Sequence, residues 1–203
     1  MKRILALTAA TFVFASAATA QQTFEQTIAA AQAEVGDIAR YQEALQNPDP
    51  RFQYALIQQM LKLPDPALQR IAKEHALFST NPVMREAAIK AIFDAKTTLR
   101  MQFAGSGETY DSFTRLVSQA GGVFVGKTGE LLTPVPEAIN NECWGTRGSC
   151  RYRQVGNSVQ IVFDLGNRIS FNANVTLGND GVLRGTARHY IGELVQMQID
   201  LKQ

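Results

Sequence analysis

The sequence predicts an α+β protein: an N-terminal antiparallel helical bundle followed by a C-terminal antiparallel β-meander or small barrel with one disulfide. Three observations lead to this prediction. Apolar residues in the first half recur every three or four positions, as they do along one face of a helix. From Cys150 onward they alternate with polar residues, as in a half-buried strand. Cys143 and Cys150 are the only cysteines, and their closeness favours one disulfide between them.

The chain divides into segments with different patterns. We expect a signal peptide over 1–20, a helical domain over 21–100, a connection rich in glycine and proline over 101–142, and an antiparallel β domain over 143–203. Within the connection, the pattern indicates one short helix over 110–119 and a strand near Val123. The length of the chain is compatible with one domain or with two small ones.

The first residues have the features of a removable export signal. Lys2 and Arg3 precede an apolar run over 4–14 and the small residues 18–20, which are typical of a cleavage site. The run has 11 residues, whereas a membrane-spanning helix needs about 20, so we expect cleavage and no membrane span. The sequence therefore predicts an exported bacterial chain, periplasmic or secreted, that begins at Gln21 after processing.

Charge is balanced once the predicted signal is removed. Eighteen lysines and arginines then stand against 18 aspartates and glutamates, with nine of each sign on either side of residue 100. Proteins that bind nucleic acid need a surplus of basic groups to displace the counterions of the phosphates. The composition therefore argues against a nucleic acid as partner.

Residues 24–46 are predicted to form a helix of about six turns. Its apolar positions follow intervals of four and three, and they are Phe24, Ile28, Ala31, Val35, Ile38 and Leu45. Gln42 interrupts the pattern. This spacing indicates an amphipathic helix that belongs to the predicted bundle.

Three helix starts then recur at intervals of 16 residues, each an Asp or Asn followed by proline. The side-chain oxygen at the N-cap can accept a hydrogen bond from the first turn, and proline fixes the backbone angle of the first helical position. The starts predict helices over 50–63, 66–78 and 82–96. Their predicted buried stripes are Phe52, Leu56, Met60 and Leu63; Leu68, Ile71, His75 and Phe78; and Val83, Ala87, Ala91 or Ile92, and Ala95.

Residues 49–96 resemble helical repeats of the HEAT or armadillo type. The resemblance rests on the Asp-Pro and Asn-Pro openings, on a two-helix period of about 32 residues, and on the run from Asn81 to Ala88. It implies protein binding on a concave helical face. An ordinary helical bundle is the alternative.

Turn residues set the register of the predicted β-meander. A three-residue loop at 179–181 pairs Leu177 with Leu183, apolar to apolar, and a loop of the same length further upstream pairs Phe163 with Phe171. We expect about five strands with one apolar face. Either the helices or closure of the sheet on itself must cover that face.

The opposite face of this sheet is the best candidate for a ligand surface. Its polar residues are Arg151, Arg153, Arg184, Arg188, Asn172, Asn174, Thr186 and Tyr190. Guanidinium groups hold carboxylates and phosphates through paired hydrogen bonds, so this face would suit an anionic small ligand. The alternative is a solvated sheet face whose arginines pair with Asp164 and Asp200.

The loop between the two cysteines is a second candidate surface. It contains Trp144 and Arg147, and a disulfide would hold it rigid. An exposed Trp144 would suit a contact with a protein partner, whereas a buried Trp144 would be structural. The six-residue spacing between the cysteines argues against a redox pair, which usually has two residues.

The chain shows no clear catalytic, metal or cofactor site. His75 and His189 fall on apolar faces, with His189 opposite Phe171, and neither has a second ligand at the spacing of a zinc site. Residues 121–128 fit the pattern of a phosphate-binding loop, but no strand precedes them and no helix is predicted to follow.

These observations predict an exported periplasmic binding or protein-interaction protein without catalysis. Its partner would be another envelope protein or an anionic small ligand. The alternative is a hydrolase acting on cell-envelope polymers, with carboxylates drawn from Glu108, Asp111, Glu130 and Glu137.

Overall fold

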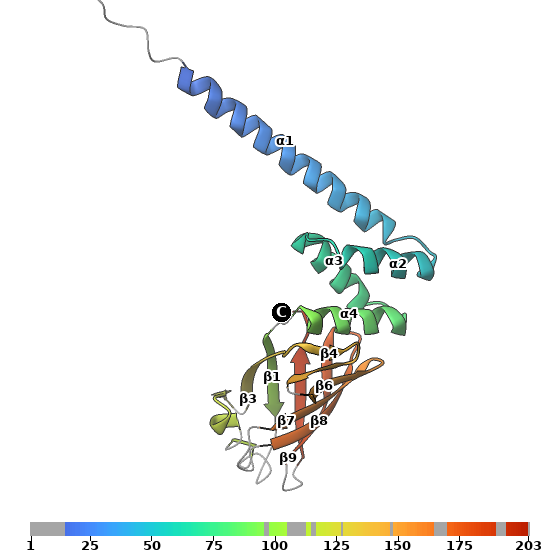
Figure 1. Ribbon diagram of the computed structural model, residues 1–203, viewed down its shortest axis with the longest axis vertical. Helices are drawn as coiled ribbons and strands as arrows, with labels where there is room; N and C mark the ends of the chain where they lie inside the picture. The colour runs from blue at the N-terminus through green and yellow to red at the C-terminus, as the bar shows by residue number, and fades with distance from the viewer. Residues whose placement is uncertain are drawn as a thin grey trace, which may run out of the picture. The chain divides into compact units, whose positions relative to one another are not determined.

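The computed structural model describes residues 15–95, 98–104, 113–114, 117–126, 128–146, 148–164, 170–189 and 194–202. The chain forms two compact units, Met1–Glu43 and Ala44–Gln203. Helix α1 (Ala15–Ala44) accounts for the described part of the first unit (Figure 1). It runs through the predicted cleavage position, so the signal peptide stays a prediction.

The predicted N-terminal bundle is not confirmed, because α1 belongs to a unit of its own. Within this first unit, Phe24 and Val35 of the apolar face of α1 are each 66% exposed. Leu45, which follows α1 and lies in the second unit, is buried. A HEAT-type repeat is likewise not established.

Three further helices are described in the second unit: α2 (Pro50–Met60), α3 (Pro66–Leu77) and α4 (Pro82–Asp94). All begin where the sequence predicts. The carboxylate of Asp49 accepts a hydrogen bond from the backbone N–H of Arg51 at 2.9 Å, and Asp65 and Asn81 cap their helices in the same way. The helices end one to three residues before the predicted positions.

The predicted buried stripes of all three helices are partly wrong. In α2 Phe52 is 45% exposed, whereas Ile57, outside the expected stripe, is buried. In α3 the buried side chains include Ala72 and Ala76, one position beyond the expected stripe, while Phe78 is 50% exposed. In α4 Val83 is exposed and Met84 is buried. The reason is that α4 packs against helices and also contacts the sheet, so more than one face of it is covered.

The described strands form one antiparallel sheet of ten, which curls into a half-barrel (Figure 1). The strands are β1 (Thr98–Ala104), β2 (Val123–Val125), β3 (Thr128–Pro134), β4 (Ala138–Asn140), β5 (Cys143–Thr146), β6 (Ser149–Val155), β7 (Ser158–Asp164), β8 (Ser170–Leu177), β9 (Val182–His189) and β10 (Leu194–Asp200). Their order is β2-β3-β1-β10-β9-β8-β7-β6-β5-β4. The first strand therefore lies beside the last.

The predicted meander is confirmed, and so is its register. Leu177 pairs with Leu183 and Phe163 with Phe171. The segment 101–142, expected as a connection, instead contains most of β1 and all of β2, β3 and β4. The strand expected near Val123 is β2. Of the short helix expected over 110–119, residues 113–114 and 117–119 are helical, and the other five lie outside the described residues.

Aromatic side chains fill the concave face of the sheet. Phe103 and Phe171 lie edge to face with ring centroids 5.3 Å apart, and Phe163 stacks on Phe171 at 5.0 Å. Phe113 lies 5.8 Å from His189, which is 7% exposed and pairs with Phe171 as predicted. These contacts make the inner face a packed core.

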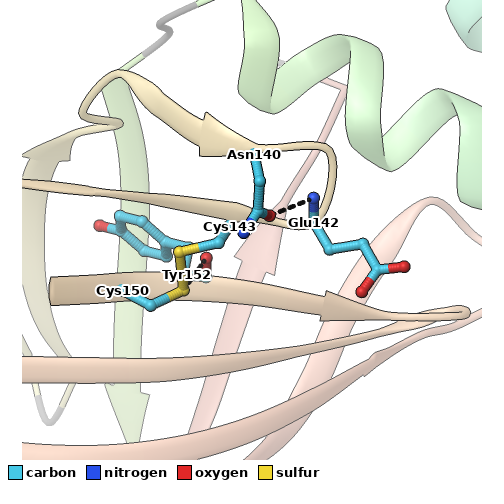
Figure 2. Close-up of a disulfide and its surroundings, with 5 residues drawn as sticks. All are labelled: Asn140, Glu142, Cys143, Cys150 and Tyr152. Carbon is cyan, nitrogen blue, oxygen red and sulfur yellow. Dashed lines mark hydrogen bonds between the residues drawn. A yellow bond between two sulfur atoms is a disulfide. The ribbon is translucent and has the colours of Figure 1, made fainter. Parts of the chain in front are cut away.

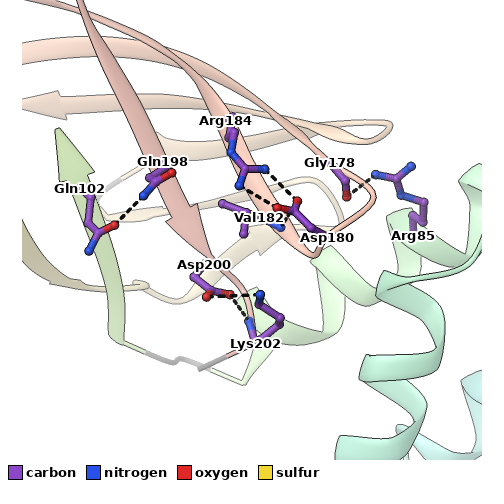
Figure 3. Close-up of polar contacts among 9 residues, drawn as sticks. All are labelled: Arg85, Gln102, Gly178, Asp180, Val182, Arg184, Gln198, Asp200 and Lys202. Atoms are coloured by element: carbon purple, nitrogen blue, oxygen red, sulfur yellow. Dashed lines mark hydrogen bonds and ion pairs between the residues drawn. The ribbon is translucent and has the colours of Figure 1, made fainter. Parts of the chain in front are cut away.

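Side-chain hydrogen bonds connect α4 to the sheet and its turns. The Arg85 guanidinium donates to backbone carbonyls of the β8–β9 turn, including that of Gly178 at 2.8 Å (Figure 3). The Gln154 amide donates to a backbone carbonyl of α4 at 2.8 Å. The indole N–H of Trp144 donates to the Asp94 carboxylate at 3.0 Å. Helix α4 and the sheet are therefore one compact unit.

Candidate functional site

The convex face of the sheet carries a groove over β7, β8 and β9. Two cross-strand rows form its floor. In one row Gln160 pairs with Asn174, which pairs with Thr186. In the next row Asn172 pairs with Arg188. The groove measures about 430 Å³ and presents amide, hydroxyl and guanidinium groups side by side.

Apolar side chains border this groove, which we call the Arg188 groove. Val162 and Leu194 lie in the row of Arg188, on either side of Asn172 and Arg188, and they are 49% and 48% exposed. Adjacent strands are about 4.8 Å apart, so neighbouring members of a row can contact one ligand together. The groove can therefore hold charged, polar and apolar parts of a ligand at once.

The structure brings some of the predicted site residues together and separates others. Asn172 and Arg188 line the Arg188 groove. Arg153 lies on β6, one strand beyond its floor, opposite Gln160. The Arg151 guanidinium lies over the ring of Phe163, 5.5 Å from its centroid. Tyr190 and Arg147 lie outside the described residues.

Arg184 forms an ion pair within its own β-hairpin. Its Nη1 and Nη2 donate to the two carboxylate oxygens of Asp180 at 2.8 and 2.7 Å (Figure 3). These hydrogen bonds hold the pKa of Asp180 well below its usual range and raise the pKa of Arg184. The sequence suggested Asp164 and Asp200 as partners of the arginines, so the partner observed for Arg184 is a different one.

A second groove of about 310 Å³ crosses β9, β10, β1 and β3. The Gln198 amide donates to Gln102 at 2.7 Å, and the Gln102 amide donates to Glu130 at 2.7 Å (Figure 3 shows the first of these bonds). This row of side chains was not predicted from the sequence. The sequence feature that could have indicated it is the alternation in β1, where Arg100 and Gln102 alternate with the apolar, buried residues Leu99, Met101 and Phe103.

A third hollow, of about 430 Å³, lies among α2, α3 and α4. Its charged lining residues are Lys62, Lys73, Lys90 and Asp94. Lys90 pairs with Asp94 at 2.5 Å. We call this hollow the lysine groove.

The loop between the cysteines is structural in its described part. Cys143 and Cys150 form the predicted disulfide, with Cα atoms 5.6 Å apart (Figure 2). Beside it, the backbone N–H of Glu142 donates to the Asn140 side chain at 3.0 Å and shapes the β4–β5 turn (Figure 2). Trp144 is fully buried, so of its two predicted roles the structure supports the structural one.

Other chemistry is sparse in the described part of the chain. It contains no cluster of three or more His, Cys, Asp or Glu side chains arranged to hold a metal ion. Burial lowers the pKa of His75 below 6.5. No described helix is both long enough and apolar enough to cross a membrane.

Comparison with known proteins gives no family for this chain. No family model matches it, and neither a curated protein nor a solved structure does.

Proposed function

We propose that this chain is an exported periplasmic binding protein without catalytic activity, which holds an anionic envelope molecule in the Arg188 groove. The proposal rests on a difference between Arg188 and Arg184 in the partners of their side chains. Arg184 is held by Asp180, whereas no described residue forms a hydrogen bond or ion pair with the Arg188 side chain. A guanidinium that is exposed in a groove and has no partner among the described residues is suited to an anionic ligand.

The neighbours of Arg188 suit the rest of such a ligand. Asn172, Asn174 and Gln160 each offer an amide donor and an amide acceptor, and Thr186 offers a hydroxyl. Val162 and Leu194 can contact its apolar parts. A carboxylate or phosphate on Arg188, with hydroxyl or amide groups over the neighbouring row, would use this arrangement fully.

The export part of the proposal rests on the sequence and on the disulfide. Residues 1–20 have the features of a cleavable signal. A disulfide between Cys143 and Cys150 is consistent with an oxidising compartment.

The hydrolase alternative has less support. Among the described residues, Glu130 is the one carboxylate that lines its groove, and it accepts a hydrogen bond from Gln102. Glu137 does not line that groove, and Glu108 and Asp111 lie outside the described residues. Glycoside hydrolysis uses two carboxyl groups that face one bond.

Side-chain NMR of the full chain tests the proposal. Citrate and inorganic phosphate serve as probes, and the amide NH₂ signals of Asn172, Asn174 and Gln160 report on the Arg188 groove. We expect these signals to shift on titration and Arg188→Gln to weaken the probe's affinity at least 10-fold. A matched variant, Lys62→Gln with Lys73→Gln, should leave that affinity unchanged.

Two results would overturn the proposal. One is a shift confined to Gln58 and Gln69, which line the lysine groove. The other is equal probe affinity in the wild type and in Arg188→Gln.

A further inference from the structure

A continuous row of side chains joins the Arg188 groove to the second groove on the convex face of the sheet. Thr186 of β9 lines the Arg188 groove, and its cross-strand partner Gln196 of β10 lines the second groove. We call the whole line of cross-strand partners the bridging row. From β7 to β3 its members are Gln160, Asn174, Thr186, Gln196, Ala104 and Thr128.

The bridging row is long enough for a polymer. It crosses the adjacent strands β7, β8, β9, β10, β1 and β3. Neighbouring strands are about 4.8 Å apart, so the row extends over about 24 Å. A single ligand that contacts both grooves must therefore be a chain of several units.

The bridging row offers hydrogen-bonding groups that the described part of the protein leaves unused. Its members on β7, β8, β9 and β10 are exposed, and their side chains form no hydrogen bond with another described residue. Each of these amides and hydroxyls can both donate and accept. An apolar partner would leave them unpaired, so the row suits a partner with hydroxyl or amide groups along its length.

The two grooves differ in charge. Arg188, and Arg153 on β6 next to the end of the row, have no ion-pair partner among the described residues. Arg184 and Glu130, which line the second groove, each have an oppositely charged partner, at 2.7 and 4.0 Å. The Arg188 groove therefore suits an acidic group, and the second groove suits an uncharged one.

The second groove holds its amides in fixed positions. Gln198 donates to Gln102, and Gln102 donates to Glu130. Each of the two amides uses one N–H in this way and has a second N–H for a ligand. Side chains that are already ordered lose less conformational entropy when a ligand binds.

We propose that the ligand of the Arg188 groove is a linear glycan that carries acidic groups on only some of its units, and that it lies across the strands from the Arg188 groove to the second groove. A carboxylate of one unit binds Arg188, and uncharged units with hydroxyl or acylamino groups follow the bridging row. The C–H groups of a sugar ring contact Val162 and Leu194. This inference rests on the proposed function, because the acidic unit occupies the Arg188 groove.

A polymer with a charge on every unit fits this surface less well. Polyphosphate and polyglutamate are of this kind. Their charges would enter the second groove, where the described cation, Arg184, already has Asp180 as its partner. A charge that loses water without gaining a partner weakens binding.

Isothermal titration calorimetry of the full chain with hyaluronan oligosaccharides tests the proposal. In this linear glycan, glucuronate alternates with uncharged N-acetylglucosamine. The disaccharide can fill the Arg188 groove alone, whereas the octasaccharide can follow the bridging row. We expect the octasaccharide to bind about 10-fold more tightly or better, because it adds several hydrogen bonds.

Variants assign this gain in affinity to the second groove. Gln196→Ala with Gln198→Ala should remove the gain and leave the affinity for the disaccharide unchanged, which also shows that the variant is folded. The matched control, Gln58→Ala with Gln59→Ala on α2, should keep the gain. Arg188→Gln should weaken both oligosaccharides by about 10-fold.

Three results would overturn the inference. They are equal affinity of the wild type for the two oligosaccharides, a gain that persists in Gln196→Ala with Gln198→Ala, and tighter binding of octaglutamate than of the octasaccharide. The last result would indicate an acidic peptide as the ligand.

The citrate and phosphate titrations separate this inference from the proposed function. If citrate or phosphate shifts the Asn172 amide signals but the octasaccharide does not bind, the glycan inference fails and the proposed function stands. If none of the three probes binds, both fail.

Discussion

Replacing Trp144 tests the packing that joins the sheet to α4. The side chain is fully buried, and its ring centroid lies 5.0 Å from that of Phe93. Its indole N–H donates to Asp94, and the Lys90 ammonium lies 5.9 Å from its ring centroid. Trp144→Phe would remove the hydrogen bond and leave a void where the larger ring was.

The magnitude follows from these contacts. The Asp94 side chain is 40% exposed and keeps Lys90 at 2.5 Å, so losing the indole donor costs about 1 kcal/mol. The smaller ring leaves a cavity and lost contacts that cost about 2 kcal/mol. The free energy of unfolding should fall by about 3 kcal/mol, which lowers Tm by about 6–12 °C for a unit of this size.

Urea unfolding followed by far-UV circular dichroism measures the change, since the variant lacks the fluorescent reporter. Asp94→Ala in both backgrounds completes a double-mutant cycle, and the two changes should couple by about 1 kcal/mol. A loss below about 0.5 kcal/mol for Trp144→Phe would refute the assignment of this side chain to the buried contact.

Three further outcomes follow from the second unit. Arg85→Met removes the guanidinium that donates to Gly178, and it should lower the free energy of unfolding by about 1–3 kcal/mol in urea melts; no change would mean that this contact does not fasten α4. Replacing Cys143 and Cys150 with serine should cost about 2.5 kcal/mol by calorimetry, from the loop they close, and an unchanged Tm would contradict the stabilising role. Burial lowers the pKa of His75, so just below pH 6.5 the unfolded chain binds more protons than the folded one. Stability should therefore decline as pH falls through this range, and His75→Gln should flatten that decline in melts at several pH values; an equal slope in the variant would rule His75 out as its source.

The local parts of the fold could be predicted from the sequence. Helix starts at Asp49, Asp65 and Asn81 depend on a cap and a proline that are neighbours in the chain. The pairing of Leu177 with Leu183 depends on a short turn. Each of these features depends on residues that are close in the sequence, so the sequence pattern was enough to predict it.

The features that depend on contacts between residues far apart in the sequence could not be predicted. Strand β1 comes soon after helix α4, and its antiparallel partners β3 and β10 come later in the chain. Its alternation of buried and exposed residues is short. The sequence therefore assigned these residues to the end of the helical domain and the start of the connection. The burial of Trp144 depends on Phe93 of α4, which the sequence alone did not place beside it. Likewise, Arg184 and Arg188 look equivalent in the strand pattern, and among the described residues it is the ion pair of Arg184 with the turn residue Asp180 that distinguishes them.

Native mass spectrometry tests the central claim, that the Arg188 groove holds a partner. The wild type, Arg188→Gln, and the control Lys62→Gln with Lys73→Gln would be isolated gently, in parallel, from a host that exports the chain. We predict a bound anionic companion on the wild type and on the control, and its absence from Arg188→Gln. A companion retained by Arg188→Gln, or no companion on the wild type, would contradict the claim.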